Sequence, residues 1–402
     1  MAGYSRAEAA VRAGVDPGHI DRLIEVGIIH PDAHGQLTRG DVRRAQLAHT
    51  LQNAGVGLER LADGIRDGHL ALDFMDAPTY DRFALLSDET FQDLSARTGL
   101  PLQLLMFIRD ATGGATPNPD DQVREDELAV VPLVEIALAM GFRPVSIERQ
   151  LRVLGEGMRR VAETESDAWR SDLTEPMLAK GATAVELGAS STSETTWRHD
   201  KAMDEAVLAI WHAQSARSWT ANLIAAFEKT LTDAGLLTLD QRPPAICFLD
   251  ITGYTRLTHE RGDKAAADLA AALSRLVNRA ALERGGRPVK WLGDGVMVYF
   301  RNPGPAVVAA LDLVDGVTSA GLPPAHVGLH AGTVLFQEGD YFGQTVNLAS
   351  RIAEYARPGE VLVTQEVVDA SGAAEGTFTE IGPVELKGIS GVVRLYAAHR
   401  HA

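Results

Sequence analysis

The segment AICFLDITGYT (residues 245–255) joins a continuous apolar run to one aspartate and a turn that contains a glycine. An apolar run of this length is typical of a buried strand, so Asp250 lies at the end of that strand. The turn brings the carboxylate and several backbone N–H groups to one point, and Gly253 leaves room for a phosphate to come close. The alternative is that Asp250 only caps the helix that follows.

A second segment, VKWLGDGVMVYF (residues 289–300), predicts a hairpin of two apolar strands with Asp294 at its tip. Most Asp-Gly pairs in hairpins are simply turns. If this hairpin lies beside the strand 245–251, however, Asp250 and Asp294 converge. Paired carboxylates suit Mg²⁺ or Mn²⁺ bound to a triphosphate, so we interpret the two aspartates as a metal site.

Two later segments carry further polar residues. In GDYFGQTVNLASRI (residues 339–352), Asn347 and Arg351 lie four residues apart and so share one helix face. An amide and a long cation that point together suggest contacts to a phosphate or another oxyanion. VELKGISG (residues 384–391) places Lys387 on a short strand before a glycine. In isolation, Arg351 and Lys387 would be interpreted as ordinary surface residues.

Around these segments, predicted strands and helices alternate. Strands are predicted at 245–251, 287–292, 296–300, 326–335, 360–364, 376–381, 384–387 and 392–398, and helices at 262–284, 304–318 and 343–356. This mixture predicts an α+β fold in which helices pack against a sheet.

In this order and at these separations, the four segments resemble the catalytic domain of class III adenylate/guanylate cyclases over about residues 243–398. The resemblance implies a ferredoxin-like domain with an antiparallel-rich sheet. The helical N-terminal region resembles that of soluble actinobacterial cyclases, in which the N-terminal half regulates the catalytic half.

The resemblance also implies roles for individual residues. Two metal ions per site, Mg²⁺ or Mn²⁺, would be held by Asp250 and Asp294 with help from the backbone carbonyl of Ile251. Asn347 would orient the ribose. Arg351 would stabilise charge on the α-phosphate in the transition state.

Substrate contacts are implied at three further places. Lys290 and Asp340 would recognise the purine, Lys387 would contact the terminal phosphates, and the turn that follows the first strand would also bind substrate through Gly253, Tyr254 and Thr255. Lys290 only donates and Asp340 only accepts, which suits the N1 acceptor and the exocyclic amine of adenine. Guanylate cyclases, the alternative, typically carry Glu and Cys at these two positions. We therefore expect an adenylate cyclase that makes 3',5'-cyclic AMP and pyrophosphate from ATP.

The resemblance to class III cyclases also implies a homodimer. In this family the metal aspartates face the purine and transition-state residues of a different catalytic domain. Because one chain carries both sets, a head-to-tail homodimer would build two complete sites.

The N-terminal region is expected to be mainly helical. Residues 1–74 resemble the winged helix-turn-helix of MerR-type regulators, with caps at Ser5 and Thr38 and a turn at 31–35 that joins two short strands. Residues 75–155 look like a second copy at an offset of about 85 residues. Residues 156–240 are interpreted as a helical linker or dimerisation segment whose apolar stripe (210–231) is core or dimer contact, and residues 241–402 as the catalytic domain.

Charge argues against DNA as a partner. The chain has a net charge of −16, and residues 1–240 hold 23 Lys/Arg against 37 Asp/Glu. An acidic domain repels phosphate backbones, although Arg39, Arg43 and Arg44 could supply part of a DNA-docking face. A DNA-binding regulator and a nucleotide sensor without turnover stay as alternatives.

Location and effector are less constrained. The single Cys247 excludes an internal disulfide, no export signal is visible, and the longest apolar run, Leu128–Met140, is interrupted by Glu135. We expect a cytoplasmic protein without a membrane span. The effector would be an apolar small molecule or a proton. The small molecule would bind at residues 100–108, for which the alternative is ordinary core, and the proton would bind at His199 and His212.

Overall fold

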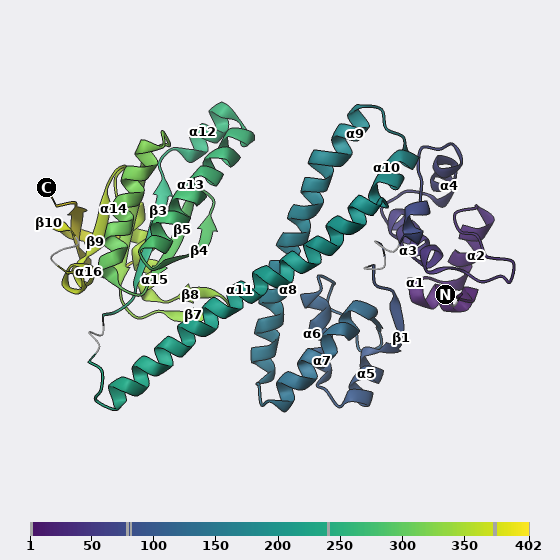
Figure 1. Cartoon of the computed structure of the whole chain (residues 1–402), viewed down its shortest axis with the longest axis horizontal. Coiled ribbons are helices and arrows are strands. Elements are labelled where there is room, and N and C mark those ends of the chain that lie inside the picture. The colour runs from purple at the N-terminus through teal and green to yellow at the C-terminus, as the bar shows by residue number, and fades with distance from the viewer. Residues whose placement is uncertain (1–2, 78–79, 81–82, 239–241, 373–375, 402) are drawn as a thin grey trace. The chain divides into compact units, whose positions relative to one another are not determined.

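The computed structural model describes residues 3–77, 80, 83–238, 242–372 and 376–401, and the chain divides into two compact units, Met1–Ala226 and Phe227–Ala402. The first unit is almost entirely helical (Figure 1). The second is built on a sheet with helices on both faces. This is the mixed α+β architecture that the sequence predicts.

The first unit begins with two modules of four helices each. The first contains α1 (Arg6–Ala13), α2 (Pro17–Glu25), α3 (Arg39–Asn53) and α4 (Leu58–Arg66), followed by a 3₁₀ turn, η1 (Asp73–Asp76). The second contains β1 (Leu86–Thr90), α5 (Phe91–Thr98), α6 (Leu102–Ala111), β2 (Gln122–Arg124), α7 (Glu125–Ala139) and α8 (Pro144–Trp169).

The predicted helix caps are present. The Ser5 side chain accepts a hydrogen bond from the Glu8 backbone N–H, and the Glu8 carboxylate accepts one from the Ser5 backbone N–H. Thr38 and Asp41 form the same reciprocal pair at the start of α3. The predicted wing strands are absent. Residues 32–36 form the expected turn, but the only β pairing recorded beside it in the described chain is one bridge between Tyr4 and Leu37. A single bridge satisfies too few backbone groups to make a hairpin.

The two modules follow the same plan. Helices α1 and α5 have eight residues each, and α3 and α7 have fifteen each. Both first helices carry a capping box and end at a left-handed glycine, Gly14 with φ 69° and Gly99 with φ 72°. These correspondences favour the interpretation as a tandem repeat, which stays a prediction.

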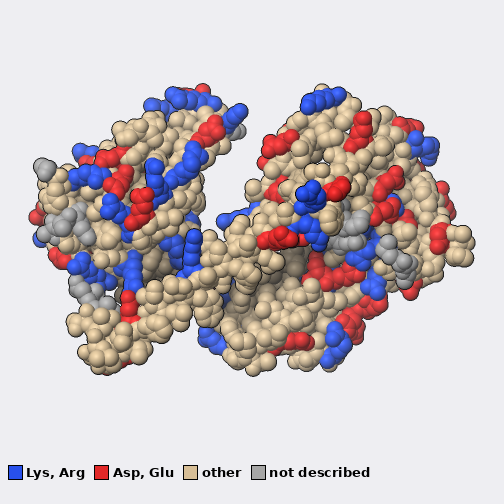
Figure 2. Space-filling model, in the orientation of Figure 1, with Lys and Arg blue, Asp and Glu red and all other residues tan. Residues whose placement is uncertain are grey.

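The arginines considered for DNA contact are used inside the protein. Arg43 is 3% exposed and donates to the Met75 carbonyl, while Arg44 is bonded to Asp41, to Asp76 and to the Leu72 carbonyl. Arg39 pairs with Glu125 at 2.5 Å. On the face shown in Figure 2, acidic and basic residues intermingle over this unit, without a continuous basic surface. These contacts engage the three arginines within the protein, and the expectation that DNA is not a partner stays a prediction.

Residues 100–108 belong mainly to a hydrophobic core. Leu104, Leu105 and Ile108 are at most 1% exposed and pack in one cluster with Phe91 and Val134. This is the ordinary-core interpretation of that segment.

A further run of helices follows α8 along the chain and ends seven residues past Ala226. A π-helical turn, η3 (Arg170–Thr174), follows α8 and leads to α9 (Glu175–Ala179), α10 (Ala184–Ser191) and the long α11 (Glu194–Asp233). The apolar stripe on α11 is exposed in the single chain, with Trp211 at 54%, Trp219 at 67% and Phe227 at 63%. It is therefore not core of this chain, which leaves the contact interpretation.

The second unit has a seven-stranded sheet in the order β10-β11-β9-β6-β3-β5-β4. Its strands are β3 (Ala245–Ile251), β4 (Gly286–Leu292), β5 (Gly295–Phe300), β6 (Ala325–Ala331), β9 (Val361–Thr364), β10 (Thr377–Glu385) and β11 (Val392–His399). Among the described strands of this sheet, only β6 and β9 pair in parallel. A separate hairpin joins β7 (Leu335–Gln337) to β8 (Asp340–Phe342).

Alternation along β3 divides the core. Cys247, Leu249 and Ile251 pack with α13 (Asp263–Glu283) and α14 (Pro303–Ser319) on one face. Ile246 and Phe248 pack on the other face, against α15 (Gln344–Tyr355) and Tyr341 of β8. Strand β3 is thus buried on both sides, as its unbroken apolar sequence predicts.

Some predicted boundaries were wrong. The strand expected at 326–335 is split into β6 and β7, and the two strands expected at 376–387 are one strand with an irregular register, so Lys387 lies in a turn after β10 and not on a strand. Two short helices, α12 (Tyr254–Arg261) and α16 (Gln365–Ala370), were not predicted. None of the helices among the described residues combines the length and the apolar character that a membrane crossing requires.

Candidate active site

The two predicted metal aspartates come together at the end of β3. Asp250 is opposite Gly295 in the β3–β5 ladder, so Asp294 in the preceding turn is its neighbour across the strands. Partial burial raises the pKa of the Asp250 carboxyl, the Asp294 charge raises it further, and His326 opposes both effects. Two carboxylates that repel one another, at a strand end where Asp250 is still 45% exposed, fit a divalent cation by charge and ligand type.

Two glycines allow this approach. Gly293 has a φ of 74°, which turns the chain sharply before Asp294. Gly295 is needed for space, because a Cβ there would be 2.9 Å from the Leu249 carbonyl oxygen and 3.1 Å from Asp250 Oδ1. The Gly-Asp-Gly sequence therefore does more than form a turn, since its second glycine lets β5 lie against the Asp250 carboxylate.

The predicted turn after β3 is also in place. Ile251 is the last residue of β3, and its backbone N–H contributes a hydrogen bond to the Asp250 carboxylate. Gly253 has a φ of 80° and precedes the first residue of α12, Tyr254. Thr255 follows in the same helix. The positive φ at residue 253 explains why a glycine is needed between strand and helix.

A histidine beside Asp250 was not predicted. His326 of β6 is paired with Asp250 across the sheet, and its Nε2 is 3.7 Å from Asp250 Oδ2. Its Nδ1 is 3.2 Å from Thr252 Oγ1, and its side chain is 13% exposed. The signal in the sequence was a histidine inside an apolar strand, which has meaning only once β6 is known to pair with β3.

Lys290 and Asp340 are brought together from distant parts of the sequence. Lys290 Nζ in β4 is 2.5 Å from Asp340 Oδ2 in β8, and the two side chains are 37% and 24% exposed. The ammonium also lies 5.9 Å from the centre of the Phe342 ring. A donor and an acceptor therefore lie side by side at a partly open surface.

An aromatic cluster holds the β7–β8 hairpin that carries Asp340. Tyr341 stacks on Tyr299 of β5 with ring centres 4.4 Å apart, and Arg287 of β4 donates a 2.9 Å hydrogen bond to the Tyr341 hydroxyl. The Arg287 guanidinium also lies over the rings of Phe336 and Tyr341, at 5.2 and 5.4 Å. These contacts, which the sequence analysis missed, fix the hairpin against β4 and so position Asp340 beside Lys290.

Asn347 and Arg351 lie on α15, as predicted, but in different surroundings. Asn347 lines a cavity of about 830 Å³ together with His330, Thr333, Gly343 and the turn 388–390 that follows Lys387. Arg351 is 39% exposed and bonds both carboxylate oxygens of Glu354 at 2.6 Å. Lys387 itself is exposed at the edge of that turn.

The site residues thus fall into separate groups. The cavity beside Asn347 is lined, within the described part of the chain, by residues that include neither Asp250 nor Asp294. His330 in its wall donates to or accepts from Thr364 at 2.8 Å, and burial lowers the pKa of its imidazole. The carboxylate pair is therefore not part of the wall of the Asn347 cavity.

Two protein families match this chain. Residues 241–399 match the adenylate and guanylate cyclase catalytic domain, and residues 35–197 match the adenylate cyclase regulatory domain. A pH-sensitive adenylate cyclase of Mycobacterium tuberculosis is 29% identical over 326 residues, which is 77% of this chain and 78% of that protein.

Two further relatives align over shorter stretches. An uncharacterized protein of M. tuberculosis is 32% identical over 62% of this chain and 63% of its own length. An adenylate cyclase of Streptomyces coelicolor is 32% identical over 58% of this chain and 57% of its own. For both, the alignment spans less than two thirds of the relative.

The C-terminal unit carries a class III adenylate/guanylate cyclase catalytic domain. The chain joins it to an adenylate cyclase regulatory domain, so the prediction of an adenylate cyclase is confirmed at the level of the family. The regulatory match begins within residues 1–74 and continues past residue 155, across the module boundaries drawn from the sequence. The likeness of residues 1–74 to MerR-type regulators stays a prediction.

Proposed function

We propose that this protein converts ATP to 3',5'-cyclic AMP and pyrophosphate, as a homodimer with both active sites at the interface between catalytic domains. The observation that carries the choice of substrate is the pairing of Lys290 with Asp340 at 2.5 Å. The cyclase domain supports the reaction class, and this pair supports adenine over guanine.

Adenine fits this pair without any change in protonation. Lys290 donates to N1, and Asp340 accepts from the exocyclic amine, so a bound adenine replaces the contact that the two side chains make with each other. A guanine in the same ring position would present its N1–H donor to Lys290 and its O6 acceptor to Asp340, so both hydrogen bonds would be lost unless the ring shifts. Once the bound base shields this pair from water, a polar group without a partner costs about 1–3 kcal/mol, which corresponds to roughly 5- to 150-fold selectivity.

Asp250 and Asp294 would hold two divalent ions, Mg²⁺ or Mn²⁺, together with the Ile251 carbonyl. When bound, these ions acidify the ribose 3'-hydroxyl and neutralise the triphosphate. The protein contributes the position of the carboxylates, which Gly295 allows, and the substrate-facing turn at Gly253, Tyr254 and Thr255.

Asn347 would orient the ribose, and Arg351 would stabilise the charge that grows on the α-phosphate. For this, the guanidinium must leave Glu354, whose carboxylate it now bonds twice. The exchange replaces a carboxylate by a phosphate as the partner of the guanidinium, so its net free-energy cost is small if the phosphate oxygens take the positions of the carboxylate oxygens. Lys387, beside the turn that lines the Asn347 cavity, would meet the terminal phosphates.

The dimer is supported by two observations. Asp250 and Asp294 do not line the cavity that Asn347 lines, as expected if the two sets of one active site come from different chains. In addition, α11 exposes an apolar stripe that includes Trp211, Trp219 and Phe227. Exposed apolar stripes of this kind mark contact surfaces.

The regulatory domain would control turnover. A relative that aligns over 77% of this chain is named as pH-sensitive, so a proton is one candidate effector and a small molecule is another. Any change that moves the two catalytic domains apart by about 1 Å would reduce turnover strongly. The availability of ATP and the single buried Cys247 favour the cytoplasm as the site of action.

The first experiment incubates the full chain with ATP or GTP and Mg²⁺ or Mn²⁺ and separates the nucleotides by chromatography. Cyclic AMP from ATP, absent in Asp250→Ala, is the expected result. Cyclic GMP from GTP at equal kcat/KM would refute the role of Lys290 and Asp340. Tight ATP binding without any product would support a nucleotide sensor instead.

A further inference from the structure

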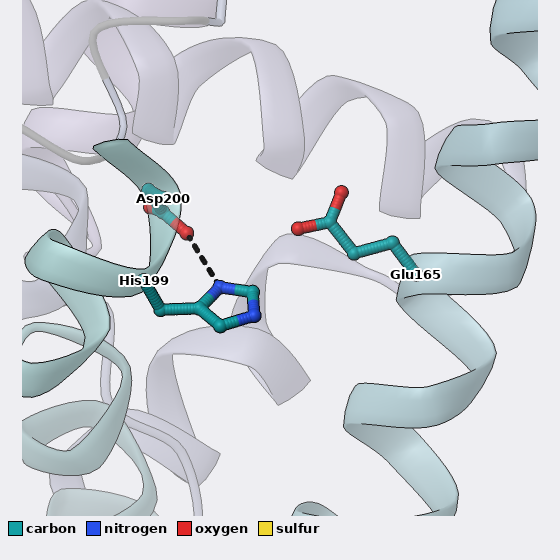
Figure 3. A group of neighbouring side chains, drawn as sticks. All are labelled: Glu165, His199 and Asp200. Atoms are coloured by element: carbon teal, nitrogen blue, oxygen red, sulfur yellow. Dashed lines mark ion pairs between the residues drawn. The ribbon is translucent and has the colours of Figure 1, made fainter. Parts of the chain in front are cut away.

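Three ligand-type side chains meet in the first unit, far along the sequence from the proposed metal aspartates Asp250 and Asp294. Glu165 lies near the end of α8, and His199 and Asp200 lie in the second turn of α11. One carboxylate oxygen of each acid and one ring nitrogen of His199 all lie within 4.8 Å of one another. Figure 3 shows the imidazole between the two carboxylates.

We propose that Glu165, His199 and Asp200 form a binding site for a divalent transition-metal ion of the Zn²⁺ type. One imidazole and two carboxylates are a ligand set that suits Zn²⁺ and its first-row neighbours. The two acids carry a charge of −2 when ionised, which one divalent ion neutralises. This site is separate from the proposed catalytic site, and the inference does not depend on the cyclase reaction.

The geometry is close to what coordination requires. Ligand atoms bound to one Zn²⁺ at about 2.0–2.2 Å lie roughly 3 to 4 Å apart, so the present separations need only a small contraction. His199 Nδ1 is already 3.7 Å from Asp200 Oδ1. Glu165, which approaches from the other helix, is half-buried and can supply the remaining movement through side-chain rotation.

The imidazole is held by its surroundings. The ring of Trp169, one turn after Glu165 on α8, meets the His199 ring edge-on with centres 5.2 Å apart. This contact restricts rotation of the imidazole and keeps it between the two acids. The His199 side chain is 50% exposed, so water can reach the position that three protein ligands leave open on a tetrahedral ion.

An ion at this site would join two helices. It would link α8 to the start of α11, the helix that continues along the chain to Asp233. Because the unfolded chain does not hold the three ligands together, binding would stabilise the first unit.

The test is a calorimetric titration of the untagged full chain with Zn²⁺. The chain carries Asp250→Asn and Asp294→Asn, so that the proposed catalytic metal site does not contribute. We expect one equivalent of Zn²⁺ per chain and a rise in the Tm. Co²⁺ at the same site should show the visible absorption of a tetrahedral N/O site.

Matched variants decide whether these residues are the ligands. Glu165→Gln and His199→Ala should each weaken Zn²⁺ binding by at least about tenfold and remove the rise in Tm. Two control variants should leave the Zn²⁺ affinity and the rise in Tm unchanged. Glu163→Gln changes an exposed acid that lies two residues before Glu165 and pairs with Arg159, and His212→Ala changes a histidine on the same helix as His199.

Equal Zn²⁺ binding by all four variants, or no binding up to about 100 times the protein concentration, would refute the site. If the double-aspartate background does not fold, the same titration compares Glu165→Gln with Glu163→Gln in the native chain. A difference of one equivalent is then expected, and equal stoichiometry would refute the proposal. None of these readouts uses cyclase activity, so failure of the proposed reaction would be seen separately.

Discussion

Gly295→Ala tests how the sheet places the catalytic carboxylates. Gly295 is opposite Asp250 in the β3–β5 ladder. An alanine Cβ there would be 2.9 Å from the Leu249 carbonyl oxygen and 3.1 Å from Asp250 Oδ1. The first contact is with the backbone of the central strand, which has no rotamer to change, so β5 or β3 must move.

The expected cost follows from these distances. Forcing one extra carbon into a packed site costs about 1–3 kcal/mol. For a domain of this size, that corresponds to a fall in Tm of roughly 3–10 °C. The displacement separates Asp250 from Asp294, and a misplacement approaching 1 Å lowers turnover by about a hundredfold. We therefore expect a larger loss in kcat than the loss of stability alone would produce.

The assay measures thermal unfolding of the native protein and of Gly295→Ala. It then measures cyclic AMP formation at a temperature well below the Tm of both. The control is Gly316→Ala on α14, where a Cβ would meet only Leu276 Cδ2 at an ordinary 3.8 Å. Because alanine is favoured over glycine inside a helix, this control should keep its activity and gain up to about 1 kcal/mol of stability. Unchanged Tm and kcat in Gly295→Ala would refute the reasoning.

Three further predictions follow from the same site. Asp250→Ala and Arg351→Ala should each be inactive alone. After subunit exchange in an equal mixture, half of the dimers are mixed and each has one intact site of two, so about a quarter of the native activity should return. No recovery would argue against active sites shared between chains. Arg287→Met removes the 2.9 Å hydrogen bond to the Tyr341 hydroxyl and should lower kcat/KM for ATP by roughly tenfold with a smaller effect on GTP; an equal loss for both nucleotides would indicate a purely structural role. Because the folded-state pKa of Asp250 is raised, the native state holds this proton more tightly than the unfolded chain, so stability falls as pH rises from the ordinary carboxyl pKa through the raised one. In the absence of metal, Asp250→Asn should remove this pH-dependent fall in stability and raise the Tm slightly at neutral pH. The gain in the free energy of unfolding should be at most about 1 kcal/mol, because the Asp250 side chain is partly exposed. A lower Tm would contradict the repulsion between Asp250 and Asp294.

Local sequence signals predicted what depends on neighbours in the chain. Ser5 and Thr38 start their helices where expected, because a cap needs only a backbone N–H two or three residues away. The strand at 245–251 was predicted correctly because an unbroken apolar run must be buried on both faces. The wing strands were wrong, because a turn signal does not ensure that the flanking residues pair.

The sequence by itself determined the class of the protein, since the order and spacing of Asp250, Asp294, Asn347 and Arg351 are written along the chain. Tertiary structure alone decided how the surrounding residues are used. Arg44 binds Asp76, 32 positions away, and Arg287 binds Tyr341, 54 positions away, so these arginines support the fold and a hairpin. The same holds for His326 beside Asp250 and Glu165 beside His199. The physical reason is that a cap acts over one turn, whereas a pairing between distant side chains exists only when the whole core fixes both backbones.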